Sequence, residues 1–283
     1  MQDLNCPICL SANIQFFKKN IAPDYDLKVC KNCNVIYANP FKAPTIDFYT
    51  EADDLSSIER HTVLFPLPQQ HPARNCKELQ NGKGKKLLDI GCGNGSFASF
   101  ASDKGFNILG LDIDENSLRL ADSRNLKNTE FRKGLLSDFY NNKNNHGQFD
   151  IITMFEVFEH LDNPNDTIEY ISKLLKPGGY FIGSLPNINR LKMWDYCMNY
   201  ELPPYHLTFW TIETWKNYIE AKNFELVAAN NNNYYGYISD YFREKSQNKI
   251  VRKLFEGIKM IIESPIEKYT NNGAGFMFIT KLK

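Results

Sequence analysis

Four cysteines near the start of the chain occur as two closely spaced pairs. Cys6 and Cys9 form one C-x2-C pair, and Cys30 and Cys33 form a second, 20 residues further on. A tetrahedral zinc ion takes four soft thiolate ligands, which two tight turns can supply. The pattern predicts a structural zinc ribbon over residues 1–40. It disfavours a redox-active pair, because no thioredoxin-like βαβ pattern surrounds either motif.

Carboxylates and imidazoles form a second candidate group. If Met154–Leu161 is helical, Glu156, Glu159 and His160 lie on one face at i, i+3 and i+4. His206 follows in a later segment. Such residues can bind Mg²⁺, Mn²⁺ or Zn²⁺. Two alternatives stay open: these four residues hold a cation that acidifies a substrate hydroxyl, or His160 or His206 is a general base without metal.

A glycine-rich segment, Leu87–Phe97, has the features of a ligand-binding turn. Its glycines are Gly91, Gly93 and Gly95. They allow the backbone to approach a ligand closely at a helix N-terminus. The dinucleotide fingerprint would need glycine where Ser96 stands. Asp89 would repel a pyrophosphate but suits an amino-acid ammonium, and Asp112 can bind both hydroxyls of a ribose.

Short apolar strands alternate with amphipathic helices around these motifs. The strands are expected at 87–90, 107–112, 129–133, 149–155, 180–185, 225–230 and 275–281, and the helices at 96–104, 115–124, 165–175 and 211–222. This alternation predicts an α/β, Rossmann-like domain with a mainly parallel sheet and helices on both faces. We expect that domain at 85–283, with substrate-side inserts at 187–210 and 231–272. A connector with a helical stretch at 73–79 occupies 41–84.

The glycine-rich segment resembles motif I of class I S-adenosylmethionine (SAM) dependent methyltransferases. Leu109–Asp112, Phe149–Ile152 and Leu174–Gly179 resemble further strands and turns of that family. The resemblance implies SAM as the methyl donor. The residues it implies for SAM binding are Asp89, Gly91, Cys92, Gly93, Gly95, Asp112, Ile113, Leu136 and Phe155. The family usually has an adenine-reading acid where this chain has Leu135, which leaves adenine recognition to the backbone or Asp138.

The Glu-x-x-Glu-His segment, residues 156–160, also carries a resemblance. It is similar to the metal-binding segment of ubiquinone-biosynthesis O-methyltransferases and of small-RNA 3′-terminal 2′-O-methyltransferases. A Glu-His-Leu turn is also widespread in the superfamily where no metal is bound. The chain as a whole resembles bacterial methyltransferases that modify precursors of surface polysaccharides. That resemblance implies O-methylation of a small polar metabolite, such as a nucleotide-linked sugar or glycan intermediate.

Composition narrows the alternatives. The 283 residues are 42% hydrophobic, which excludes a disordered chain, and 33 basic residues balance 33 acidic ones. This balance disfavours nucleic acid as a partner, so an RNA methyltransferase is a secondary alternative. A non-catalytic SAM-binding protein is another, against which the intact Asp89, glycines and Asp112 argue. Neither a membrane-spanning run nor a secretory signal is recognised, which predicts a cytoplasmic protein. Burial is expected for Cys76, Cys92 and Cys197. An apolar stripe over Asn248–Ile262 is compatible with a homo-oligomer.

Overall fold

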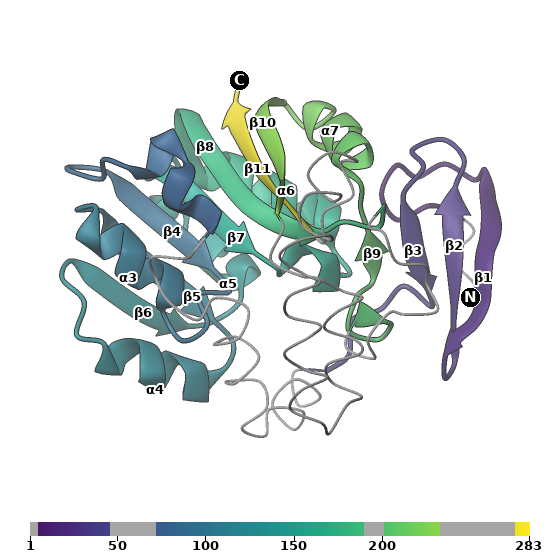
Figure 1. The fold of residues 1–283 in the computed structure, drawn as a ribbon, viewed down its shortest axis with the longest axis horizontal. Helices are drawn as coiled ribbons and strands as arrows, with labels where there is room; N and C mark the ends of the chain where they lie inside the picture. Colours follow the sequence, from purple (N-terminus) through teal and green to yellow (C-terminus); the bar gives the residue numbers. More distant parts are fainter. Residues whose placement is uncertain (1–4, 46–71, 190–200, 233–274) are drawn as a thin grey trace, which may run out of the picture.

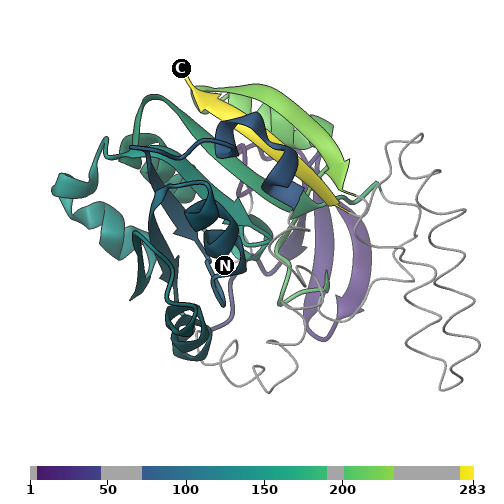
Figure 2. The ribbon, with the colours of Figure 1, turned by 60° about the vertical axis from the view of Figure 1, so that its left-hand side comes forward.

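The computed structural model describes residues 5–45, 72–189, 201–232 and 275–283, which form two β-sheets (Figure 1). The larger sheet has the order β10-β11-β8-β7-β4-β5-β6. Its strands are β4 (Lys86–Ile90), β5 (Asn107–Asp112), β6 (Thr129–Lys133), β7 (Phe149–Phe155), β8 (Leu175–Pro186), β10 (Phe224–Asn232) and β11 (Gly275–Leu282). Strands β4 to β8 pair in parallel, whereas β11 is antiparallel to both β8 and β10, which flank it (Figure 2). The predicted Rossmann-like, mainly parallel fold is confirmed.

Helices cover both faces of this sheet. They are α3 (Ser96–Asp103), α4 (Glu115–Ser123), α5 (Leu136–Asn141), α6 (Pro164–Leu174) and α7 (Ile212–Glu220), with short 3-10 helices η2 (Pro72–Asn75), η3 (Lys77–Leu79), η4 (Lys143–Asn145) and η5 (Phe158–His160). The central strands are buried on both sides, so neighbouring residues serve different cores. Ile152 packs in the core that contains α6 and α7, whereas Ile151 packs in the core that contains α3.

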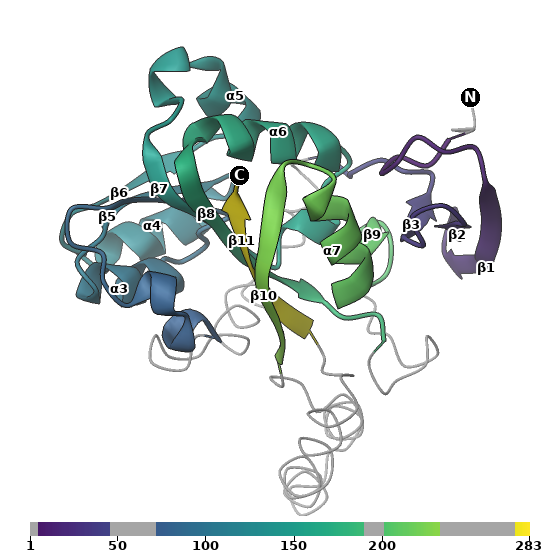
Figure 3. The ribbon, with the colours of Figure 1, turned by 90° about the horizontal axis from the view of Figure 1, so that it is seen from above.

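A second sheet has four strands in the order β1-β2-β3-β9. Its strands are β1 (Ile14–Ala22), β2 (Tyr25–Cys30), β3 (Ile36–Asn39) and β9 (Thr208–Phe209). The first three follow one another in sequence, but β9 comes from the segment before α7. Figure 3 shows these four strands to one side of the large sheet, with β9 nearest to α7. The N-terminal region is therefore joined to the rest of the chain by a shared sheet.

Two local expectations are corrected. Strand β8 begins at Leu175, so Pro177-Gly178-Gly179 lies inside the strand and does not interrupt it. The pairing register with β7 shifts at this point, and Gly178 has a φ of 72°, so the strand accommodates the turn residues as an irregularity. The helical stretch at 73–79 is two separate 3-10 helices, η2 and η3.

Several sequence predictions concern residues that the structure does not describe. These include most of the 231–272 insert with the stripe at 248–262, much of the 41–84 connector, and Cys197. The boundaries 1–40, 41–84 and 85–283 stay predictions. Within the described ranges, no helix is long and apolar enough to cross a membrane.

Candidate active site and metal centres

The glycine loop follows β4, the strand at which the order of the large sheet reverses. Strands β5 and β6 lie on one side of β4, and β7 and β8 lie on the other. In open parallel sheets, ligands bind beyond the carboxyl ends of the strands at this point. Gly91, Gly93 and Gly95 all have positive φ, at 71°, 50° and 74°, a conformation in which glycine carries no steric penalty. The loop leads directly into α3, with Gly95 as its N-cap.

Asp112, at the end of β5, is tied to the glycine loop. Its Oδ2 accepts a 2.7 Å hydrogen bond from the Gly93 amide, and its Oδ1 accepts one of 2.9 Å from the Asp114 amide. These two bonds fix the orientation of the carboxylate beside the loop. Sequence reasoning missed Arg124, whose guanidinium donates to the Asn94 carbonyl and so braces the loop from the end of α4. No motif marks that arginine.

Asp89 is buried, with 2% of its surface exposed. Thr153 donates a 2.7 Å hydrogen bond to its Oδ1. Burial raises the pKa of Asp89 to about 7, against the lowering effect of Thr153, and the negative charge of Asp112 raises it further. A carboxyl so poised becomes charged readily when a cationic group arrives next to it.

The other predicted cofactor residues differ in what their side chains contact. Cys92 is buried, and its sulfur would lie 2.8 Å from a Cβ added at Gly110. The ring of Phe155 packs on Phe97 with centroids 4.8 Å apart. Side chains of Cys92 and Phe155 thus belong to the core, which leaves their backbones for a ligand.

The residues that the sequence predicts to lie near the adenine are more open. Ile113 and Leu136 are half-buried, and Leu135 and Asp138 are exposed. Leu135 is the N-cap residue of α5, and its apolar side chain makes no capping hydrogen bond. It has no polar group that could read the adenine. Asp138 lies in the first turn of α5 and is the nearest acid in sequence.

The segment after β7 is not a continuous helix, so the helical geometry assumed for it is wrong. Only Phe158–His160 form a helical turn, η5. Glu156 has a φ of 53° and Val157 a φ of −130°, both outside the helical range. A non-glycine residue at positive φ is uncommon and often marks a functional segment.

This break separates Glu156 from the other three predicted ligands. The Glu156 carboxylate accepts a 2.5 Å hydrogen bond from the Ser184 hydroxyl on β8. It still lies close enough to raise the pKa of Glu159 by charge repulsion, which adds to the larger effect of burial. Glu156 is therefore an electrostatic neighbour of the cluster.

Glu159, His160 and His206 come together from two segments that are far apart in sequence. Their ligand atoms lie within 4.8 Å of one another. The Glu159 Oε1 atom is 3.8 Å from Nε2 of His160 and 3.9 Å from Nε2 of His206. Glu159 is 1% exposed, and its Oε2 has no hydrogen-bond partner in the described part of the chain. A buried carboxylate oxygen left without a donor is costly, which suits a site completed by a cation.

The tautomer of His160 is set by a backbone contact. Its Nδ1 lies 2.7 Å from the Tyr205 carbonyl oxygen, which can only accept, so Nδ1 carries the proton. The Nε2 atom then lies on the side of Glu159, 3.8 Å from its Oε1 atom. Metal-binding histidines are commonly held in this way, by donating the other ring N–H to a carbonyl.

Glu159, His160 and His206, which together form the histidine cluster, are linked to the glycine loop by Val157. A Cβ added at Gly91 would lie 2.4 Å from Cγ2 of Val157, so only glycine fits at that place in the loop. Val157 stands two residues before Glu159 in the same segment. The glycine loop therefore contacts the segment that carries Glu159 and His160.

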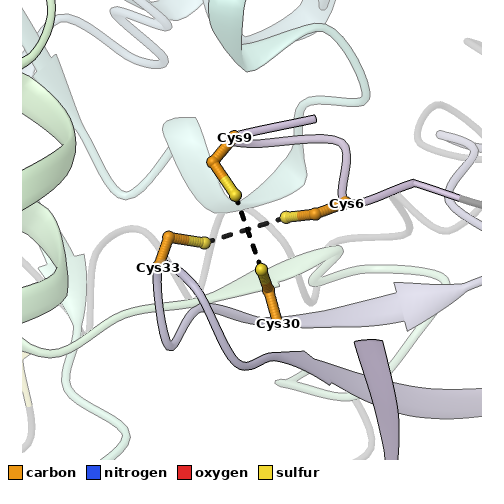
Figure 4. A group of neighbouring side chains, drawn as sticks. All are labelled: Cys6, Cys9, Cys30 and Cys33. Carbon is orange, nitrogen blue, oxygen red and sulfur yellow. Dashed lines mark hydrogen bonds between the residues drawn. The ribbon is translucent and has the colours of Figure 1, made fainter. Parts of the chain in front are cut away.

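The four N-terminal cysteines gather as their spacing predicts. Figure 4 shows their side chains pointing toward a common centre, with Cys6 opposite Cys33 and Cys9 opposite Cys30. The two sulfur–sulfur distances are 3.8 and 3.4 Å. Sulfurs 2.3 Å from a tetrahedral zinc ion lie about 3.8 Å apart, so the arrangement fits the metal and is far too wide for a disulfide.

Each C-x2-C turn, or knuckle, directs a backbone amide at one of its cysteine sulfurs. The amides of Ile8 and Asn32 each donate to a cysteine sulfur, at 3.4 Å to Cys6 and Cys30 respectively. A hydrogen bond with the Cys33 thiol lowers the pKa of Cys6 to about 5, despite the opposing effect of burial. The same hydrogen bond raises the pKa of Cys33, and burial raises the pKa of Cys30, so without metal Cys6 is the thiol most readily deprotonated. Thiolates are the ligands that zinc requires.

Comparisons with known proteins agree with this geometry. Residues 64–229 match the model of a family described as a methyltransferase domain. A ubiquinone biosynthesis O-methyltransferase of Acinetobacter baumannii (strain ACICU) is 33% identical over 138 residues, which cover 46% of this chain and 57% of the relative. The Bordetella avium (strain 197N) protein of the same name is 32% identical over 164 residues, covering 54% of this chain and 67% of the relative. The chain thus spans just over half the length of the first of these relatives.

Solved structures share the fold at low sequence identity. A SAM dependent methyltransferase from Archaeoglobus fulgidus superposes with a TM-score of 0.52 and 22% identity, covering 74% of this chain and 90% of that one. The complex between the Haloferax volcanii Trm112 methyltransferase activator and a putative methyltransferase gives a TM-score of 0.56 at 16% identity, covering 85% of this chain and 98% of the matched chain.

Proposed function

The chain belongs to the methyltransferase domain family, and we propose that it is an enzyme that transfers the methyl group of SAM to a hydroxyl of a small polar acceptor. The observation that carries the proposal is the contact of Val157 with Gly91, because Val157 stands two residues before Glu159 in the segment that also bears His160. The curated relatives named above are O-methyltransferases by name, which supports oxygen as the acceptor atom.

For the donor, we propose that the glycine loop holds the methionine part of SAM. Asp89 would face its ammonium group, directly or through water. The Asp112 carboxylate, oriented by the Gly93 and Asp114 amides, would accept hydrogen bonds from the ribose hydroxyls with its remaining lone pairs.

For the acceptor, we propose that Glu159, His160 and His206 bind a divalent cation, with Glu156 as a neighbour that does not ligate it. The cation, when bound, would supply Lewis acidity that lowers the pKa of the acceptor hydroxyl. The donor set of two imidazoles and one carboxylate leaves coordination positions for a substrate oxygen. The metal-free alternative makes His206 or His160 the general base.

The methyl transfer is proposed as a direct in-line displacement. The acceptor oxygen forms a bond to the methyl carbon while the carbon–sulfur bond breaks, and the hydroxyl proton passes to an imidazole of the cluster or to solvent. The chain then contributes chiefly by positioning the two substrates and by excluding water. We also propose that Cys6, Cys9, Cys30 and Cys33 bind a structural zinc ion, whose four coordination positions they would fill.

A direct assay tests the proposal. The protein would be incubated with methyl-labelled SAM and a panel of small hydroxyl compounds that includes nucleotide-linked sugars, which stay a prediction from the sequence alone. We expect S-adenosylhomocysteine to form together with an acceptor that gains one methyl mass on oxygen. Label on nitrogen or carbon, or on added RNA alone, would refute the proposed acceptor, and no SAM binding at all would refute the proposal.

A further inference from the structure

The backbone amide and carbonyl of Leu207 connect the N-terminal cysteine module (Cys6–Asn39, with the four cysteines and strands β1 to β3) to the histidine cluster. Its amide donates a 2.8 Å hydrogen bond to the Glu159 carbonyl, and its carbonyl accepts a 2.8 Å hydrogen bond from the Ala38 amide. Ala38 lies on β3 of the N-terminal sheet, and Glu159 belongs to the candidate active site. One peptide segment thus bridges the two parts of the molecule, immediately after His206.

The bridge is firmly packed. Leu207 is fully buried. It packs with Leu27, Ile36, Ala38 and Phe209 in a small hydrophobic core that is separate from the two cores of the large sheet. Strands β3 and β9 continue the contact through the antiparallel pairs Ile36–Phe209 and Tyr37–Thr208. The N-terminal sheet therefore fixes the backbone at 207–209 through packing as well as through hydrogen bonds.

The same segment carries two groups of the histidine cluster. His206 directly precedes Leu207, and its ring lies 4.8 Å from that of His160 at 76°. The Tyr205 carbonyl is the group that orients the His160 ring. A shift of this segment would displace both imidazoles relative to Glu159.

The position of β3 depends in turn on the cysteine knuckle. Cys33 lies only three residues before β3, and the turn is closed by hydrogen bonds from the Asn34 amide to the Cys30 carbonyl and from the Cys30 amide to the Val35 carbonyl. The first knuckle is tied to α6, because the Asn165 amide group donates to the Pro7 and Ile8 carbonyls. Small cysteine modules hold such turns only with their metal bound.

We propose that the cysteine module is a positioning element of the active site: through β3 and the backbone of Leu207, it holds His206 and the Tyr205 carbonyl in place against Glu159 and His160. Leu207 is a positioning residue in this arrangement. Its effect on turnover rests on the proposed function, but its effect on geometry does not.

The test is made on the full-length, zinc-loaded protein with Ala38→Pro, which removes the amide that donates to Leu207 and leaves all four cysteines intact. Zinc per chain and the dissociation constant of S-adenosylhomocysteine should stay at wild-type values. We expect amide exchange at 205–209 to accelerate at least tenfold, and the NMR chemical shifts of the His160 and His206 rings to change, because the two rings lie in contact. Turnover should fall about ten- to a hundred-fold, as for the loss of other groups that orient ligands.

Phe16→Ala, at an exposed site on β1 of the same sheet, is the matched control and should change none of these readouts. If Ala38→Pro does not fold, Ile36→Ala replaces it, since it weakens the β3–β9 contact from the β3 side without altering the backbone. Wild-type exchange at 205–209 and unchanged ring chemical shifts of His160 and His206 in a folded variant would overturn the proposal. Absent methyl transfer in the wild-type protein would refute the proposed function alone, because amide exchange and the histidine ring shifts would still report on the coupling.

Discussion

The carboxylate of Asp112 accepts a 2.7 Å hydrogen bond from the backbone amide of Gly93. This bond joins the end of β5 to the middle of the glycine loop after β4, so the loop and the acid form one structural unit. A substitution at Asp112 is therefore expected to remove a group that would bind ribose and also a brace of the loop.

Asp112→Ala should abolish the stabilisation of the protein by SAM. A ligand that binds only the native state stabilises it by about 2.7 kcal/mol at a hundred times its dissociation constant, and the variant should lose this increment. The measurement is the melting temperature with and without SAM. Asp103→Ala, at an exposed acid in the last turn of α3, is the control and should keep the wild-type response. An equal response in the two variants would contradict the assignment.

Asp89 should make SAM binding depend on pH. Because its pKa is about 7 in the free protein, pairing with an ammonium below that pH requires loss of a proton. We expect affinity to rise about tenfold from about pH 6 to about pH 8, as titration calorimetry would show. The raised pKa also means that the ligand-free fold loses stability as the pH rises from about 4 to about 7. In Asp89→Asn both dependences should flatten; an unchanged affinity profile would exclude Asp89 from ligand binding.

The parts of the fold that local pattern determines were predictable from the sequence. Alternating apolar strands and amphipathic helices gave the parallel sheet, and cysteine spacing gave the four-sulfur cluster, because each depends on residues close together in the chain. The pairing of β9 with β3 was not predictable, since a two-residue strand carries no periodicity and its partner lies about 170 residues away.

The histidine cluster was predicted in its members but not in its geometry. Helical spacing suggested that Glu156 and Glu159 share a face, whereas the backbone turns at Glu156 and sends its side chain to Ser184. Val157, the next residue, packs on the glycine loop, a contact between distant segments. Local periodicity holds no information about such contacts.

Glu159→Gln should weaken the binding of a divalent cation at the histidine cluster. The substitution keeps the size of the side chain but removes the charge that a cation needs, and loss of one of three ligands should reduce turnover by at least about a hundredfold. Activity would be measured after treatment with EDTA and after adding back Mg²⁺, Mn²⁺ or Zn²⁺. Glu156→Gln is the matched control, with a smaller expected effect. Full activity of the wild-type protein after EDTA treatment, together with an active Glu159→Gln variant, would refute the catalytic cation and favour a histidine general base without metal.

Cys30→Ser should lower the zinc content from one ion per chain toward none. A serine hydroxyl is a poor substitute for a thiolate, and three ligands no longer close the site. The measurement is metal per chain by mass spectrometry, together with the far-UV spectrum and melting temperature. Cys76→Ser, at a buried cysteine outside the cluster, should retain zinc whatever its effect on stability. Full zinc content in Cys30→Ser would refute the cluster as a metal site.

Gly91→Ala and Gly147→Ala separate backbone strain from steric conflict with Val157. Both glycines have positive φ, 71° and 63°, so each alanine pays about 1–2 kcal/mol for that conformation. A Cβ at Gly147 meets nothing within 4 Å, whereas at Gly91 it meets Val157 at 2.4 Å. We expect Gly147→Ala to lower the melting temperature only, with wild-type affinity for S-adenosylhomocysteine. Gly91→Ala must displace Val157 and distort the loop, so its affinity should fall at least tenfold. Equal affinities in the two variants would show that the contact between the loop and the Val157 segment has no part in ligand binding.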